Sequence, residues 1–140
     1  MRVELTIEIS RPQQEVFDFL TDLSRVPEWQ ASAVESRANR PLAQGTRISE
    51  RRSFMGRDLE TEVEVTAYEP PRRLTLRALE APLKLTIDHV LEERDGETSL
   101  HVTADGKPTG ALRLAGPAVE STARRELSRD FGRLKELLEE

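Results

Sequence analysis

Three ionisable residues occupy positions that are normally apolar in strands of this kind: Glu50, Arg52 and His89. In the segments around them, polar and apolar side chains alternate, and these three fall on the apolar side of the alternation. They are therefore expected to point into the interior. Burying an isolated charge is costly, so Glu50 and Arg52 must either pair with each other near water or hold a ligand. His89 is either a neutral core residue with one hydrogen bond or a group that transfers protons near neutral pH.

The chemistry open to these three residues is limited. An arginine and a carboxylate beside an apolar pocket can anchor a carbonyl, hydroxyl or carboxylate of a small ligand. Together with His89 they could also orient and protonate a poly-carbonyl chain, which needs a shaped pocket and one proton donor. The chain has no cysteine and two histidines, which excludes thiolate chemistry, disulfides and Cys-based metal sites. We therefore expect no metal and no other cofactor.

Turns set the register that points these side chains inward. A two-residue turn at Met55-Gly56 brings opposite charges together on one face and apolar residues on the other, and a one-residue slip would exchange the faces. Turns at Pro70-Pro71, Glu80-Ala81 and Asp95-Gly96 extend the meander. The lone tyrosine, Tyr68, then falls on the outer face. The predicted pairs are Ile48 with Val63, Arg47 with Glu64, Arg51 with Glu60, Val65 with Leu76, Ala67 with Leu74, Leu76 with Leu85, Leu74 with Ile87, Leu91 with Leu100, His89 with Val102, and Ile87 with Ala104.

The N-terminal segments predict a strand followed by two small helices. Residues 2–9 alternate strictly between polar and apolar side chains, as in a half-buried strand. Ser10 and Gln13 have the spacing of a capping box, and an apolar stripe at helical spacing follows. A turn around Ser24 interrupts this helix and leads to the only tryptophan, Trp29. Residues 33–38 predict a short strand.

The C-terminal segment changes period. Apolar residues recur every three or four positions over residues 110–139, which predicts one long helix with a kink where Pro117 follows Gly116. Its apolar stripe needs a partner, and the apolar face of the meander is the only large one available. We therefore predict an α+β fold in which a curved antiparallel meander wraps around a long C-terminal helix.

Composition narrows the class of protein further. A chain of 140 residues predicts a single domain over residues 1–140. The net charge of −5 argues against nucleic-acid binding, because phosphate contacts need a basic face. No apolar run approaches the ~18 residues that span a bilayer, and the first ten residues lack the continuous apolar stretch of a signal peptide. We therefore expect a cytoplasmic protein without an integral membrane segment.

Three stretches resemble the SRPBCC (START/Bet v 1-like) superfamily: "ISRPQQEVFDFLTDLSRVPEW", "YEPPRRLTLRA" and "RLKELLEE". The resemblance covers nearly the whole chain and is closest to the polyketide cyclase/dehydrase and lipid-transport group. It implies the helix-grip fold and a cavity between the sheet and the C-terminal helix for a small apolar or amphipathic ligand. It also implies that the two small helices flank the ligand entrance, which makes Trp29 a candidate entrance residue. The alternative is that Phe17, Leu20 and Trp29 simply fill the core.

The candidate site combines the inward-facing residues of the strands with the stripe of the C-terminal helix. Its predicted ligand-binding members are Phe17, Leu20, Trp29, Glu50, Arg52, Phe54, Leu59, Thr61, Val63, Leu76, Ile87, His89, Val102, Val119, Ala123 and Leu127.

Two functions fit these residues. The first is binding or transport of a small hydrophobic or amphipathic ligand, such as a lipid or a polyketide-like molecule, by a monomer or homodimer. The second is a polyketide cyclase or dehydratase-type enzyme in which Glu50, Arg52 or His89 acts on a poly-carbonyl substrate. An outward-facing Tyr68 weakens the second, because it removes a phenol from the pocket. A protein-interaction role would need an exposed apolar patch, which the sequence does not reveal.

Overall fold

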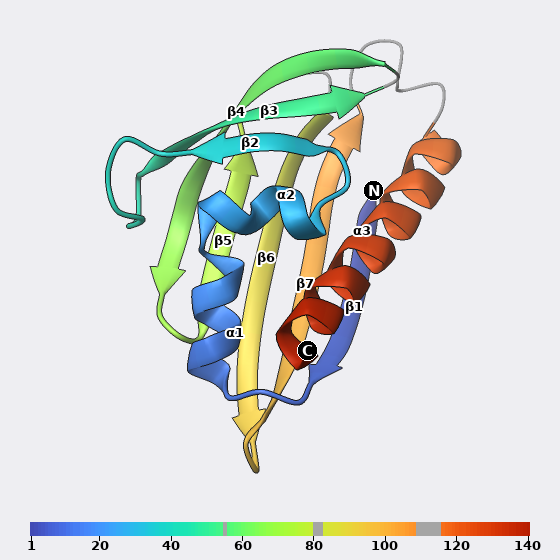
Figure 1. Cartoon of the computed structure of the whole chain (residues 1–140). Coiled ribbons are helices and arrows are strands. Elements are labelled where there is room, and N and C mark those ends of the chain that lie inside the picture. Colours follow the sequence, from blue (N-terminus) through green and yellow to red (C-terminus); the bar gives the residue numbers. More distant parts are fainter. Residues whose placement is uncertain (55, 80–82, 109–115) are drawn as a thin grey trace.

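The computed structural model describes residues 1–54, 56–79, 83–108 and 116–140 (Figure 1). Within these ranges, seven antiparallel strands form one sheet in the order β1-β7-β6-β5-β4-β3-β2. The strands are β1 (Arg2–Ile9), β2 (Ala33–Arg37), β3 (Arg47–Phe54), β4 (Arg57–Glu69), β5 (Arg73–Ala78), β6 (Leu83–Arg94) and β7 (Glu97–Pro108). The helices are α1 (Gln13–Leu20), a 3-10 turn η1 (Leu23–Arg25), α2 (Val26–Trp29) and α3 (Gly116–Glu139).

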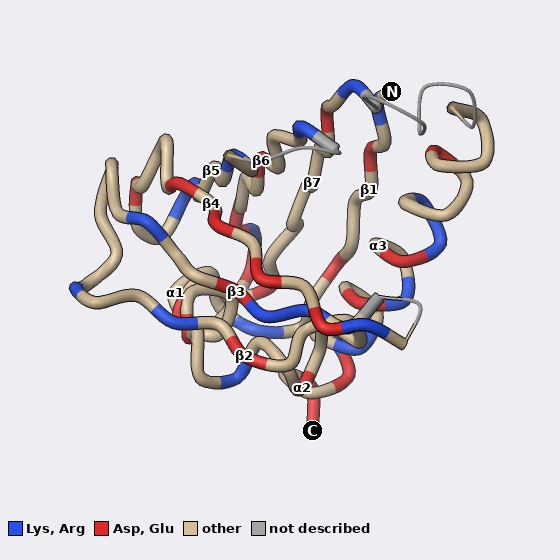
Figure 2. Tube along the Cα trace, turned by 90° about the horizontal axis from the view of Figure 1, so that it is seen from above, with Lys and Arg blue, Asp and Glu red and all other residues tan. Residues whose placement is uncertain are grey.

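The sheet is curved, and all three α-helices lie on its concave side (Figure 1). Seen from above, it bends from β1 and β7 round to β3 and β2, with α3 beside β1 (Figure 2). The core lies between the concave face and the helices, where Phe17 of α1, Trp29 of α2 and Phe131 of α3 pack on inward-facing strand residues. This confirms the predicted α+β architecture. None of the described helices has the length and hydropathy needed to cross a membrane.

Most of the predicted pairings are confirmed. Ile48 lies opposite Val63, and the charged pairs that flank them on the outer face have the predicted register. Asp95 and Gly96 have φ values of 54° and 78°, the positive values that a tight type I′ hairpin turn requires. This turn sets β6 against β7 so that His89 lies opposite Val102.

The predicted pairing of Ala67 with Leu74 is wrong, because the β4–β5 ladder contains a bulge. Val65 pairs with Leu76 as predicted, but the register then shifts, and Ala67 lies opposite Thr75. One extra residue on β4 exchanges the faces of every side chain beyond it. Tyr68 therefore lies opposite Leu74 and packs against the core, instead of pointing outward.

The register between β5 and β6 also differs from the prediction. Leu76 lies opposite Ile87 and Leu74 opposite His89, which is two residues away from the predicted pairs. A shift of two preserves the side-chain alternation, so the predicted inner face is unchanged. The connection predicted at Glu80-Ala81 lies outside the described residues, as does Met55 of the earlier turn.

The predicted capping box at Ser10 is wrong. Pro12 occupies the N-cap of α1 and makes no side-chain cap, and Ser10 Oγ donates to Glu97 instead. The backbone N–H of Gln13 donates to Glu93 Oε1 at 2.7 Å, and its side-chain amide donates to the carbonyl of Leu91 at 3.0 Å. The helix start is therefore held by β6.

The long C-terminal helix is confirmed from Gly116 onward. Pro117 lies in its first turn, where a proline is tolerated because the first backbone N–H groups have no partner within the helix. Residues 110–114 and Ala115 of the predicted helix lie outside the described residues, so the kink at Pro117 stays a prediction.

Candidate functional site

Glu50 and Arg52 form an ion pair on the inner face of β3. Nη2 of Arg52 lies 3.0 Å from Oε2 of Glu50, and Nε lies 3.3 Å from Oε1. Both residues follow the phase of Ile48, which is buried. The side chains of Arg52 and Glu50 are 27% and 12% exposed, so the pair lies at a boundary between the core and water.

The segment after α2 fixes the arginine. Nη1 of Arg52 donates to Ser32 Oγ at 2.9 Å, and Nη2 donates to Gln30 Oε1 at 2.6 Å. The backbone supports this contact, because the N–H of Ser53 donates to the carbonyl of Ser32 at 2.8 Å. Glu50 is held from the other side by Ser36 Oγ at 3.4 Å. The result is a positioned guanidinium at the corner where α2, β2 and β3 meet.

His89 lies in the core, opposite Leu74 on one side and Val102 on the other. Its Nδ1 is 2.9 Å from the carbonyl oxygen of Leu74. A carbonyl only accepts, so Nδ1 carries the proton and Nε2 holds the lone pair. Burial lowers the pKa of His89 below 6.5, and the hydrogen bond to Leu74 and the charge of Asp88 oppose this shift without reversing it. The imidazole is therefore neutral.

Acidification is expected to destabilise the fold through His89. Below pH 6.5 the unfolded chain takes up a proton on this histidine that the folded chain does not, so stability is complete above pH 6.5 and falls as the pH drops. Urea unfolding between about pH 5 and 8 measures this slope, and carboxyl groups titrate mostly below that range. In His89→Asn, which keeps a donor near Nδ1, the slope should disappear. An unchanged slope in that variant would contradict the assignment.

The candidate entrance residue, Trp29, and the predicted site residues of α1 are buried. Trp29 is 3% exposed and ends α2, and its ring centroid lies 5.0 Å from that of Phe131. The expectation that it lines an open entrance is therefore corrected. Phe17 and Leu20 are buried on α1, and the Phe17 ring is 5.7 Å from that of Tyr68. Ligand contact by these residues stays a prediction.

The apolar inner wall is only partly covered. Most of its predicted members are partly exposed, and Leu59, opposite Arg52, is 45% exposed. Val102 is fully buried, and the side chain of Phe54 lies outside the described part of the chain. The fold thus leaves apolar surface accessible next to the Arg52 corner. The partly exposed members are Thr61, Val63, Leu76 and Ile87 on the sheet and Val119, Ala123 and Leu127 on α3.

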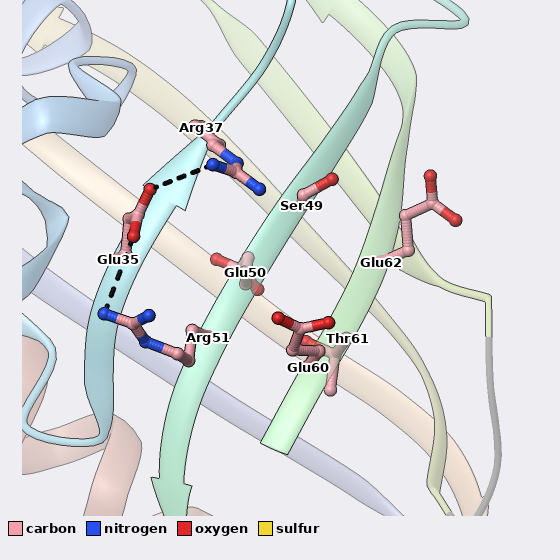
Figure 3. Close-up of a pocket in the computed structure, with 8 residues that line it drawn as sticks. All are labelled: Glu35, Arg37, Ser49, Glu50, Arg51, Glu60, Thr61 and Glu62. Carbon is pink, nitrogen blue, oxygen red and sulfur yellow. Dashed lines mark hydrogen bonds and ion pairs between the residues drawn. The ribbon is translucent and has the colours of Figure 1, made fainter. Parts of the chain in front are cut away.

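The hollows on the outer face of the sheet are lined mainly by polar and charged residues, unlike the apolar inner wall. One of about 350 Å³ opens over β2, β3 and β4 and is lined mainly by charged residues, among which Glu35 pairs with both Arg37 and Arg51 (Figure 3). Its lining also includes Glu50 and Thr61 of the candidate site. Another of about 240 Å³ contains the Arg73–Asp88 pair, where the arginine and the hydroxyl of Thr75 hold the pKa of Asp88 low against the opposing effect of burial. Glu35, Arg37, Arg51, Arg73 and Asp88 already have partners, which is typical of surface ion-pair networks. Across the described ranges, no three His, Cys, Asp or Glu side chains gather in a way that could hold a metal.

Sequence reasoning missed several residues around the inner face. The alternation places Tyr68 outward because the bulge leaves no local mark in the sequence. Phe131 belongs to the predicted helical stripe, but its contacts with Trp29 and His89 could not be read from periodicity. Gln30 and Ser32 lie in an irregular segment, where no pattern indicates that they bind Arg52.

Comparisons with known proteins agree with this fold. The family described as polyketide cyclase / dehydrase and lipid transport matches residues 1–139. The Zhui aromatase/cyclase from Streptomyces sp. R1128 superposes with a TM-score of 0.85 at 15% identity, covering 99% of this chain and 93% of that one. A START superfamily protein from Mycobacterium smegmatis gives 0.83 at 15% identity, covering 99% and 97%.

A protein from Thermus thermophilus superposes with a TM-score of 0.83 at 15% identity, over 99% of this chain and 97% of that one. No curated protein matched the sequence. At such identities the superpositions establish the fold alone, and the family match establishes the family. The curved sheet, the gripping helix and a match over almost the entire length mean that the chain belongs to the polyketide cyclase / dehydrase and lipid transport family.

Proposed function

We propose that this protein binds a small amphipathic ligand, with the apolar part against the inner wall of the sheet and α3 and the polar end at Arg52. The observation that carries the proposal is the positioned, partly exposed Glu50–Arg52 pair beside incompletely covered apolar surface. Ligand pockets of this kind are mostly apolar with a few placed polar groups that fix orientation.

The hydrogen bonding of Arg52 supports a role in binding. A guanidinium has five N–H donors, and the contacts with Glu50, Gln30 and Ser32 use four of them. One Nη1 N–H is left for a further acceptor. A partly buried ion pair contributes little net stability compared with apolar packing, so stability alone does not explain its position on this face. A ligand carboxylate or carbonyl fits both the remaining donor and the charge.

Binding of dodecanoate tests the proposal. Arg52→Met is expected to weaken dodecanoate binding by at least tenfold, because it removes a charge-assisted hydrogen bond of roughly 1.5–3 kcal/mol. Binding of dodecanol should change much less. Isothermal titration calorimetry measures both affinities.

The matched control for this experiment is Arg51→Met, the neighbouring residue on the outer face. It removes the same charge from the protein without touching the inner wall, so dodecanoate affinity should stay at the wild-type value. Equal losses in the two variants would indicate a general charge effect and contradict an anchor at Arg52. Failure of both dodecanoate and dodecanol to bind the wild-type protein would contradict the proposed function itself.

A cyclase-type enzyme is the second candidate, and the β4 bulge favours it. The bulge turns Tyr68 inward. Tyr68 on β4, Leu74 on β5 and His89 on β6 then lie side by side across the three strands. A phenol and a neutral imidazole two strands apart are groups that donate and accept protons during cyclisation or dehydration. Incubation with a poly-carbonyl probe distinguishes the two candidates. If the bound probe is recovered unchanged, the protein acts as a carrier, and if it is recovered as a cyclised or dehydrated product, the protein acts as an enzyme.

A further inference from the structure

The indole N–H of Trp29 is buried and has no hydrogen-bond partner among the described residues. It is the only side-chain polar atom in that condition in the described part of the chain. Buried donors are nearly always satisfied, because an unmade hydrogen bond forfeits the solvation that the group had in water. A tryptophan in this position calls for an acceptor that the described residues do not supply.

The position of Trp29 connects this donor with the polar corner already described. Trp29 ends α2, and the next residue, Gln30, accepts a hydrogen bond from Arg52. The Trp29 ring packs on Phe131, whose other neighbour is the neutral imidazole of His89. One short segment thus carries both the buried N–H donor of Trp29 and Gln30, which binds the positioned guanidinium, and the ring of Phe131 lies against the indole.

We propose that the ligand carries a second hydrogen-bond acceptor, a ketone, ester or hydroxyl oxygen, which accepts from the indole N–H of Trp29 while its polar end binds Arg52. This inference rests on the proposed function and specifies its ligand class. The preferred ligand is an oxygenated amphiphile with two acceptor groups. A plain acyl chain would leave the indole donor unsatisfied and would bind more weakly.

The single tryptophan makes the proposal directly observable, because the ¹⁵N-labelled protein gives one indole N–H resonance. The probes are dodecanoate and a series of oxododecanoates that place one ketone at successive positions along the chain. We expect all to bind, and we expect one or two neighbouring ketone positions to shift the indole proton downfield and to bind about tenfold more tightly than dodecanoate, as one neutral hydrogen bond allows.

Replacing Trp29 by β-(3-benzothienyl)alanine supplies the matched control, since sulfur takes the place of the N–H and the ring keeps its shape. The oxododecanoates should then lose their advantage, with dodecanoate affinity unchanged. Trp29→Phe is the genetic counterpart with the same expected ranking.

The outcomes separate the two proposals. If dodecanoate and all the oxododecanoates bind with equal affinity and shift the indole resonance by the same amount, the proposal of a second acceptor is wrong. The indole N–H would then be assigned to an internal water molecule. No binding of any probe would overturn the proposed function. Because the resonance is measured on the wild-type protein, this distinction does not depend on whether a variant folds.

Discussion

Replacing Leu134 with aspartate is expected to leave the protein unfolded at 25 °C. Leu134 is fully buried on the face of α3 that packs on the sheet. An unpaired carboxylate there costs several kcal/mol, which is comparable to the roughly 5–15 kcal/mol of total stability of a domain this size. Circular dichroism should show no cooperative thermal transition.

Aspartate substitutions at two other positions on α3 serve as comparisons for Leu134→Asp. Leu127 is partly exposed, so Leu127→Asp should destabilise the fold less than Leu134→Asp. Ser128 is exposed, and Ser128→Asp should melt within a few degrees of the wild type because surface changes cost about 0.5 kcal/mol or less. A folded Leu134→Asp with wild-type melting would show that α3 does not grip the sheet.

Phe131→Ala is expected to lower the free energy of unfolding by about 3–5 kcal/mol, the usual cost of removing a buried phenylalanine. Its ring is the contact between Trp29 on α2 and His89 on β6, at centroid distances of 5.0 and 5.8 Å. Loss of the ring should also let water reach the indole. Urea unfolding measures the free energy, and the emission of the only tryptophan should shift to longer wavelength.

Phe131→Leu provides the comparison, because it keeps most of the apolar volume and removes the aromatic contacts. It should cost clearly less than Phe131→Ala. If both variants keep the wild-type stability and emission spectrum, the packing of α3 against α2 would not depend on this ring.

Most of the fold could be predicted from the sequence, because strands and hairpins are specified by local patterns. Residues 2–9 alternate strictly, and Asp95-Gly96 is a turn signal strong enough to set β6 against β7 without an error. The charged pairs across β3 and β4 set a register that turns Glu50 and Arg52 to the inner face. Each of these features depends on residues close together in the chain.

The parts that escaped prediction depend on contacts between distant segments. The bulge after Val65 adds one residue that no local pattern marks, so the alternation assigns Tyr68 to the wrong face. The helix start at Gln13 is satisfied by Glu93, eighty residues away, instead of by Ser10. Trp29 ends α2, a helix too short to show an apolar periodicity in the sequence, and its burial depends on α3, which packs on it from the other end of the chain.

The β4 bulge also suggests a route by which such a protein changes its ligand. Beyond Val65, the choice of which side chains enter the interior depends on a single unpaired residue. If the same residues paired without the bulge, with Ala67 opposite Leu74, Tyr68 would turn to solvent and Ala67 would turn inward, which replaces a phenol by a methyl group. Substitutions that create or abolish a bulge can therefore change the pocket without altering any residue that lines it.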